Sequence, residues 1–77
     1  MEMPDWTLIR SFLAVAEAGS LSGAARATGI SQPTLGRHVH AIEAALQVAL
    51  FARTAQGQAL TEAGQALLPT ARAMQAA

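Results

Sequence analysis

Apolar residues recur over residues 6–18 at the three- and four-residue intervals that mark one face of an α-helix. Asp5 precedes this run and is a suitable N-cap, and Gly19 follows it and can end the helix. The pattern therefore predicts a first helix that begins at Trp6 and turns its apolar face to the core. The apolar positions of this helix are Trp6, Leu8, Ile9, Phe12, Leu13, Val15 and Ala16.

A second, shorter helix is predicted from Leu21 to about Thr28. Ser20 is its expected N-cap, and Gly29 suits the left-handed turn that ends many helices. The pair Ala24 and Ala25 keeps the surface of this helix low, so another helix can approach closely.

The clearest amphipathic pattern belongs to a third helix, capped by Ser31 with Pro33 in its first turn. Its apolar residues are spaced by four, three and four positions and are Leu35, Val39, Ile42 and Leu46. At about 100° per residue, the side opposite Leu35 carries Pro33, Arg37, His40 and Ala44, with His38 on the flank.

The helical pattern stops after Gln47. Two short segments, Leu50 to Arg53 and Gln58 to Leu60, are separated by residues 54–57 and predict a small β-hairpin with Gly57 in the turn. Phe51 lies in an apolar segment, so it is expected in the core, as are Trp6 and Phe12.

A last helix is predicted to start at Thr61 and to run to the end of the chain. Pro69 removes the hydrogen bond to the carbonyl of Gln65 and is expected to kink it. An apolar stripe on this helix can pack on its own domain or on a second copy of the chain. We favour the second copy, because the first helix already supplies a core. The predicted dimerisation residues are Leu67, Leu68, Ala71 and Met74.

The composition supports one small, mainly α-helical domain with a thin core. About a quarter of the 77 residues are Ala, 52% are apolar and only 13% are charged. The absence of Cys excludes disulfides, thiolate nucleophiles and Cys-based zinc sites. No run approaches the roughly 18 apolar residues of a membrane span. The acidic N-terminus, with Glu2 and Asp5, does not resemble a signal peptide, so a cytoplasmic protein is predicted.

The charges are balanced overall but unevenly placed. Five Arg and no Lys oppose five acids, which excludes a polybasic tail and a cationic membrane helix. Three of the Arg residues (Arg26, Arg37 and Arg53) occupy the middle of the chain with Glu43 as the only acid among them, giving about +2 there.

Two helices joined by a tight glycine turn, the second with an Arg on its outer side, suggest a helix-turn-helix. In this motif the second helix, called the recognition helix, enters the DNA major groove, and its first residues must offer short polar side chains there. Gln can pair with adenine and Arg with guanine through two hydrogen bonds each. Gln32 and Arg37 fit these roles, and the hairpin could serve as a wing with Arg53 directed at the DNA backbone.

Four segments, in order, resemble the N-terminal DNA-binding domain of LysR-type transcriptional regulators. They are residues 12–20 (FLAVAEAGS), the pair Ala24 and Ala25, residues 31–39 (SQPTLGRHV), and residues 50–53 (LFAR) followed by 60–64 (LTEAG). The resemblance covers nearly the whole chain. Gly36 departs from it, standing where the family commonly has Ser, and the wing lacks the basic residues often found there.

This resemblance implies a winged helix-turn-helix, a three-helix core with a short β-hairpin wing, over residues 1–60. It implies a linker helix over residues 61–77 that forms a homodimer, and binding to double-stranded DNA at an interrupted inverted repeat. The family's larger domain, which senses a small-molecule effector, would be missing, so the chain would be an isolated DNA-binding fragment of a bacterial, nucleoid-associated regulator.

The implied DNA-binding residues are, in chain order, Ser31, Gln32, Pro33, Thr34, Gly36, Arg37, His40 and Arg53. The family positions of Gln32, Pro33, Gly36 and Arg37 approach bases, and those of Ser31 and Arg53 approach the backbone. For His40, Arg53 and Arg26, the alternative is that each is an exposed surface residue that makes no contact with DNA. His38 and His40 are two positions apart and diverge, so no metal site is expected, and no cofactor is implied.

An enzyme is disfavoured, because the acids and His residues are scattered and no phosphate-binding glycine loop is present. The main alternative is a non-catalytic helical domain for protein interaction or dimerisation. Such a domain would have no DNA affinity at any salt concentration, whereas a DNA-binding domain loses affinity steeply as salt rises.

Overall fold

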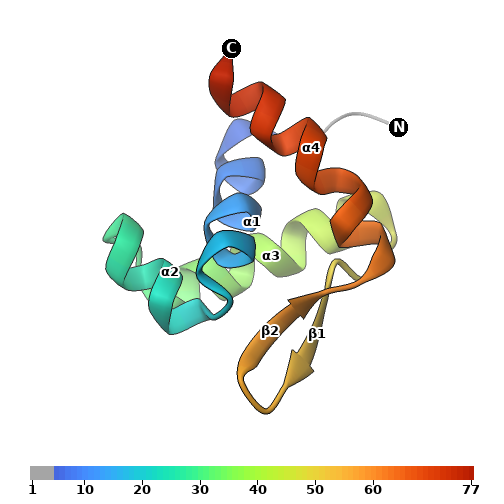
Figure 1. Cartoon of the computed structure of the whole chain (residues 1–77). Helices are drawn as coiled ribbons and strands as arrows, with labels where there is room; N and C mark the ends of the chain where they lie inside the picture. The colour runs from blue at the N-terminus through green and yellow to red at the C-terminus, as the bar shows by residue number, and fades with distance from the viewer. Residues whose placement is uncertain (1–4) are drawn as a thin grey trace.

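The computed structural model describes residues 5–77; residues 1–4, which include the acidic Glu2, lie outside the described residues. Four helices surround a small core, and a two-stranded hairpin projects from them on the side away from the C-terminal end of the last helix (Figure 1). The elements in chain order are α1 (Trp6–Ala18), α2 (Leu21–Thr28), α3 (Gln32–Leu46), β1 (Phe51–Thr54), β2 (Gly57–Leu60) and α4 (Glu62–Ala76).

The first three helices begin at the predicted caps. The Oδ1 atom of Asp5 accepts a hydrogen bond from the Leu8 backbone N–H at 3.2 Å. Ser20 and Ser31 cap α2 and α3 in the same way, and Thr61 caps α4. Gly19 and Gly29 end α1 and α2 in left-handed conformations, with φ of 76° and 77°. The C-terminal cap of α3 was not predicted: Gln47 ends this helix with φ 58°, a conformation that non-glycine residues adopt less often.

The core consists of two adjoining clusters of buried side chains. The larger joins α1, α3, the Leu50 segment and α4, and the smaller joins α1, α2 and the first half of α3. Leu35 and Ile42 of α3 are fully buried and Val39 and Leu46 are half-buried, which confirms the predicted inner face. The buried members of the two clusters are Ile9, Phe12, Leu13, Ile42, Leu50 and Ala71, and Val15, Ala24 and Leu35.

One prediction about the aromatic residues needs correction. Trp6 is 40% exposed, because it stands in the first turn of α1 while the buried cluster begins at Ile9. Phe51 is half-buried and packs against both clusters, and its ring lies 5.5 Å from that of Phe12.

The hairpin is tighter than predicted. Thr54 pairs with Gly57, so only residues 55–56 form the turn instead of residues 54–57. The wing, which we define as residues 51–60, is also tied to the helical body, because the Gln58 N–H donates to the carbonyl of Gly19 at 2.9 Å.

Helix α4 continues without interruption through Pro69 to Ala76. Pro69 and Gln65 are both exposed, so water can satisfy the carbonyl that the proline leaves unpaired. A loose ion pair of 4.0 Å between Arg72 and Glu17 adds to the contact of α4 with α1. Among residues 5–77, no helix is long and apolar enough to cross a membrane.

Candidate nucleic-acid interface

The first turn of α3 presents the predicted contact residues on the surface as a small hydrogen-bonded group. Thr34 Oγ1 accepts hydrogen bonds from Ser31 Oγ and from Arg37 Nη2, both at 3.0 Å. Ser31 Oγ also caps the helix by accepting from the Thr34 N–H at 3.3 Å. Because Thr34 Oγ1 accepts from both neighbours, its own proton is free to point outward. The Arg37 guanidinium is therefore held at the exposed start of α3 with most of its donors unused.

Gln32 and Pro33 are exposed beside this group, whereas Gly36 is half-buried. A Cβ atom at Gly36 would meet only Leu21 Cδ1, at 4.0 Å. Gly36 therefore lies against the start of α2 and keeps the surface low at this point, rather than standing at the outermost edge of α3.

A polar hollow of about 410 Å³ separates the start of α2, the start of α3 and the wing. Gln32 of α3 and Arg53 of the wing both line this hollow. The structure thus brings Arg53 towards the recognition helix, although the two lie far apart in the sequence. The remaining lining residues are Ser20, Leu21, Ser22, Thr54, Ala55, Gln56, Gly57 and Gln58.

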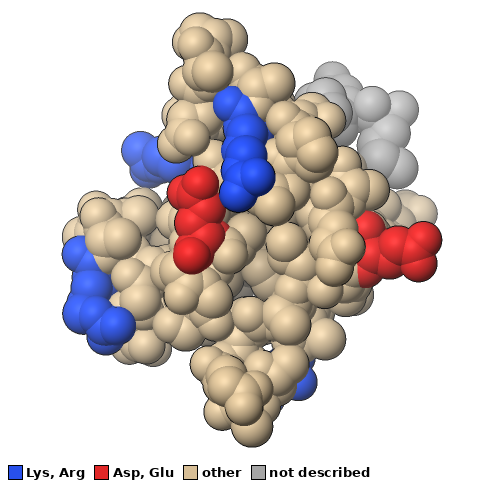
Figure 2. All heavy atoms as spheres, viewed as in Figure 1, with Lys and Arg blue, Asp and Glu red and all other residues tan. Residues whose placement is uncertain are grey.

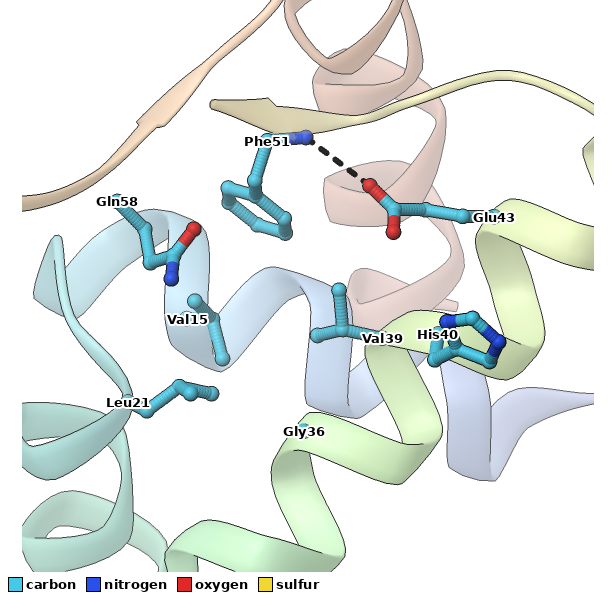
Figure 3. A pocket seen from close by; sticks show the side chains of 8 residues that line it. All are labelled: Val15, Leu21, Gly36, Val39, His40, Glu43, Phe51 and Gln58. Carbon is cyan, nitrogen blue, oxygen red and sulfur yellow. Dashed lines mark hydrogen bonds between the residues drawn. The ribbon is translucent and has the colours of Figure 1, made fainter. Parts of the chain in front are cut away.

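A second hollow, of about 210 Å³, lies further along α3 between that helix, the wing and α1 (Figure 3). His40 is exposed at its edge, and Val15, Val39 and Phe51 contribute apolar surface. Glu43 points towards the wing, and its Oε2 atom accepts hydrogen bonds from the Leu50 and Phe51 N–H groups at 2.7 and 3.2 Å.

Sequence reasoning missed this role of Glu43 and counted the residue only as an acid among basic neighbours. No local pattern predicts it, because the N–H groups that bind the carboxylate belong to a segment seven and eight residues further along the chain. His38 also has a partner that the sequence did not predict, because its Nδ1 atom lies 2.7 Å from Oγ of the buried Ser11. This contact joins α3 to α1 and makes His38 part of the packing between the two helices.

Charged side chains are few and dispersed over the surface. The face in Figure 2 carries only a few charged side chains, and near its centre an acidic side chain lies beside a basic one. Arg26 is exposed in the last turn of α2. In the described part of the chain, no group of three or more His, Cys, Asp or Glu residues could hold a metal ion.

The predicted dimerisation stripe of α4 faces the chain's own core. Ala71 is fully buried within the chain and so offers no surface to a partner, and Leu67, Leu68 and Met74 are half-buried against the larger cluster. The structure therefore shows the intrachain packing that the sequence left open as an alternative. The opposite side of α4, with Ala66 and Ala73, is exposed.

A model of the bacterial regulatory helix-turn-helix protein, lysR family, matches residues 6–65. The fold, the exposed start of α3 and this match together define the chain as a winged helix-turn-helix DNA-binding domain. The chain belongs to the LysR family of bacterial regulatory proteins.

Among curated relatives, the HTH-type transcriptional regulator TfdS of Cupriavidus pinatubonensis is 50% identical over 70 residues, which are 91% of this chain and 24% of that protein. The LysR family transcriptional regulator CbnR is similar in structure, with a TM-score of 0.90 and 40% identity over 94% of this chain and 25% of that one. A DNA complex of the CbnR DNA-binding domain has a TM-score of 0.88 and 40% identity, covering 94% of this chain and 83% of that one. The chain thus spans about a quarter of the full-length relatives that it matches.

Proposed function

We propose that this chain binds double-stranded DNA in a sequence-specific manner, with the start of α3 in the major groove and the wing on the backbone. The observation that carries this proposal is the hydrogen-bonded group at the start of α3, where Thr34 holds the exposed Arg37 guanidinium beside Gln32. Preorganised donors on an exposed helix start meet the geometric need of base recognition, because fewer side-chain rotations are lost on binding.

We assign base contacts and phosphate contacts to different residues according to the length and position of their side chains. Arg37 and Gln32 have side chains long enough to form paired hydrogen bonds with base edges, as guanine and adenine respectively require. Pro33 and Gly36 allow close approach. Ser31, at the helix N-terminus, and Arg53, which lines the polar hollow beside α3, are proposed to contact phosphates. His40 lies further along α3 and is proposed as a weaker contact at the edge of the site.

A second copy of the chain is the proposed partner, with two recognition helices reading an interrupted inverted repeat. This part rests on the family resemblance and on the side of α4 that the core leaves free. We assign dimerisation to α4, the predicted linker helix of residues 61–77, through exposed positions such as Ala66 and Ala73.

Substitutions on the two sides of α4 separate dimerisation from folding. Ala73→Glu places a charge on the free side and is expected to weaken association without changing the melting temperature of the monomer. Leu67→Glu inserts a carboxylate against the core and is expected to lower that melting temperature. Sedimentation across a concentration series measures the association. Equal dimerisation of Ala73→Glu and the parent would remove this side of α4 from the interface.

Selection of bound sequences from a random duplex pool tests the function as a whole. A DNA-binding domain enriches a sequence pattern, and two half-sites at a fixed spacing would reveal the inverted repeat. The alternative, a helical protein-interaction domain, predicts that no sequence is enriched at any salt concentration. In the complete protein, we propose that a larger domain senses a small-molecule effector and that the protein acts on bacterial DNA in the cytoplasm.

A further inference from the structure

We propose that Glu43 is a positioning residue that fixes the wing against α3, so that Arg53 contacts a phosphate while α3 contacts bases. This inference rests on the proposed DNA-binding function. In this proposal Glu43 makes no DNA contact itself but determines how well Arg53 contacts a phosphate.

Glu43 connects the end of α3 to the beginning of the wing with both its main chain and its side chain. Its backbone carbonyl accepts hydrogen bonds from the N–H groups of Gln47 and Val48, which close the helix. Its carboxylate Oε2 atom accepts from the N–H group of Leu50 at 2.7 Å. The same oxygen accepts from the N–H group of Phe51 at 3.2 Å (Figure 3). Hydrogen bonds to a charged acceptor are shorter and stronger than those between neutral groups.

No other hydrogen bond in residues 5–77 joins α3 to the start of the wing. The remaining ties hold different parts of the hairpin: Gln58 N–H binds the Gly19 carbonyl, and Thr61 N–H binds the Leu50 carbonyl at 3.0 Å. Without the Glu43 carboxylate, β1 would still pair with β2, but its direct bond to the recognition helix would be lost.

The position of Glu43 along α3 links the wing to the base-reading residues. Glu43 lies eleven residues after Gln32, which is about three turns and about 16 Å along the same side of the helix. Arg53 follows Phe51 by two residues in β1, and so points to the same side of the hairpin. A rigid helix thus spans the distance between Gln32, which we assign to a base, and the strand that carries Arg53.

The consequence is energetic coupling between Glu43 and Arg53. A phosphate contact requires the guanidinium to reach its target while α3 stays in the groove. If β1 shifts relative to α3, Arg53 must either lose the phosphate or spend binding free energy in restoring the geometry. Replacing Arg53 should therefore matter less once the Glu43 carboxylate is gone.

The test is a double-mutant cycle on the 77-residue chain, using the duplex recovered from the random pool. Affinity is measured over a range of salt concentrations for the parent, Arg53→Ala, and each Glu43 variant with and without Arg53→Ala. In the parent, Arg53→Ala is expected to reduce the slope of log affinity against log salt by about 0.9, the contribution of one phosphate. In the Glu43→Ala background it is expected to reduce the slope by less than half as much.

Two further variants separate acceptor position from charge, and they also keep the test valid if Glu43→Ala does not fold. Glu43→Gln retains an oxygen at the same reach and is expected to retain the coupling to Arg53. Glu43→Asp retains the charge but is one methylene shorter, so it is expected to lose the coupling. Glu17→Ala is the matched control, because it removes an exposed acid whose side chain pairs with Arg72 of α4 and not with the wing, so it should leave the Arg53 effect unchanged.

Equal effects of Arg53→Ala in all Glu43 backgrounds would overturn the positioning role while leaving the DNA-binding proposal intact. Loss of coupling in Glu43→Gln together with its retention in Glu43→Asp would also overturn it, since charge rather than reach would then matter. A parent chain with no DNA affinity at any salt concentration would overturn both proposals.

Discussion

The two parts of the interface, the start of α3 and the wing, are held in place in different ways. At the start of α3, the hydrogen bonds join residues three positions apart: Ser31 with Thr34, and Thr34 with Arg37. The wing depends on partners that are distant in the chain, such as Gly19 for Gln58 and Glu43 for Phe51. One region is therefore organised by local geometry, and the other exists in its observed place only when the whole domain is folded.

Gly57 is the position at which the dependence of the wing on its distant partner is greatest. Its φ is 133°, and an added Cβ would lie 2.5 Å from the Gly19 carbonyl oxygen and 3.1 Å from Ser20 Cβ. Gly57→Ala is expected to lower the free energy of unfolding by about 3 kcal/mol, because strain and a backbone clash combine. Gly29→Ala is the control. It has a positive φ but nothing within 4 Å, so a loss of only about 1 kcal/mol is expected. Chemical denaturation measures both, and equal losses would mean that the contact with Gly19 is unimportant.

Substitutions of Arg37 and Arg53 compare what the start of α3 and the wing each contribute to DNA affinity. Arg37→Ala should cost about 1–3 kcal/mol of binding free energy and relax the preference at one base position in each half-site. Arg53→Ala should instead weaken binding to the selected and to a scrambled duplex alike, since a phosphate is present in both. Titrations of both variants against both duplexes test the division. It is wrong if Arg37→Ala weakens the two duplexes equally or if Arg53→Ala changes the preferred base.

The cap of α3 tests how far local contacts alone organise the recognition helix. Ser31→Ala removes the acceptor of the Thr34 N–H and is expected to lower the free energy of unfolding by about 1 kcal/mol. Ser31→Asn retains a capping oxygen and should remain close to the parent. Thermal unfolding followed by circular dichroism distinguishes the two. A Ser31→Asn loss as large as that of Ser31→Ala would show that capping is not the relevant contribution.

The smallest expected effect is a gain of stability at Gly36. A Cβ there meets only Leu21 Cδ1 at 4.0 Å, so Gly36→Ala should raise the free energy of unfolding by up to about 1 kcal/mol through helix propensity. Gly23→Ala is the matched helical control, with Ser20 Oγ at 3.0 Å and Ala18 Cβ at 3.2 Å from the added atom. It should gain less than Gly36→Ala or lose stability. A Gly36→Ala variant no more stable than Gly23→Ala would show that free space around the Cβ does not decide the outcome.

The helix boundaries were predictable from the sequence because their causes are local. Asp5, Ser20, Ser31 and Thr61 each bond a backbone N–H three residues later, and this requires only the right residue before a helical pattern. Periodicity also identified Leu35 and Ile42 as core residues, since one face of an amphipathic helix must be buried. The family's DNA-binding segment was recognisable for the same reason, because its contact residues occupy consecutive positions at the start of one helix.

Tertiary structure alone decided which surface each apolar stripe would cover. The stripe of α4 packs on α1 and buries Ala71, and periodicity could not distinguish this from a dimer contact because both bury the same face. Trp6 continues the apolar face of α1 yet is exposed, because burial depends on neighbours that the helix itself does not supply. The role of Glu43 was hidden for a related reason. A carboxylate on an exposed helix side acquires its function only when the chain returns and places the N–H groups of Leu50 and Phe51 within its reach.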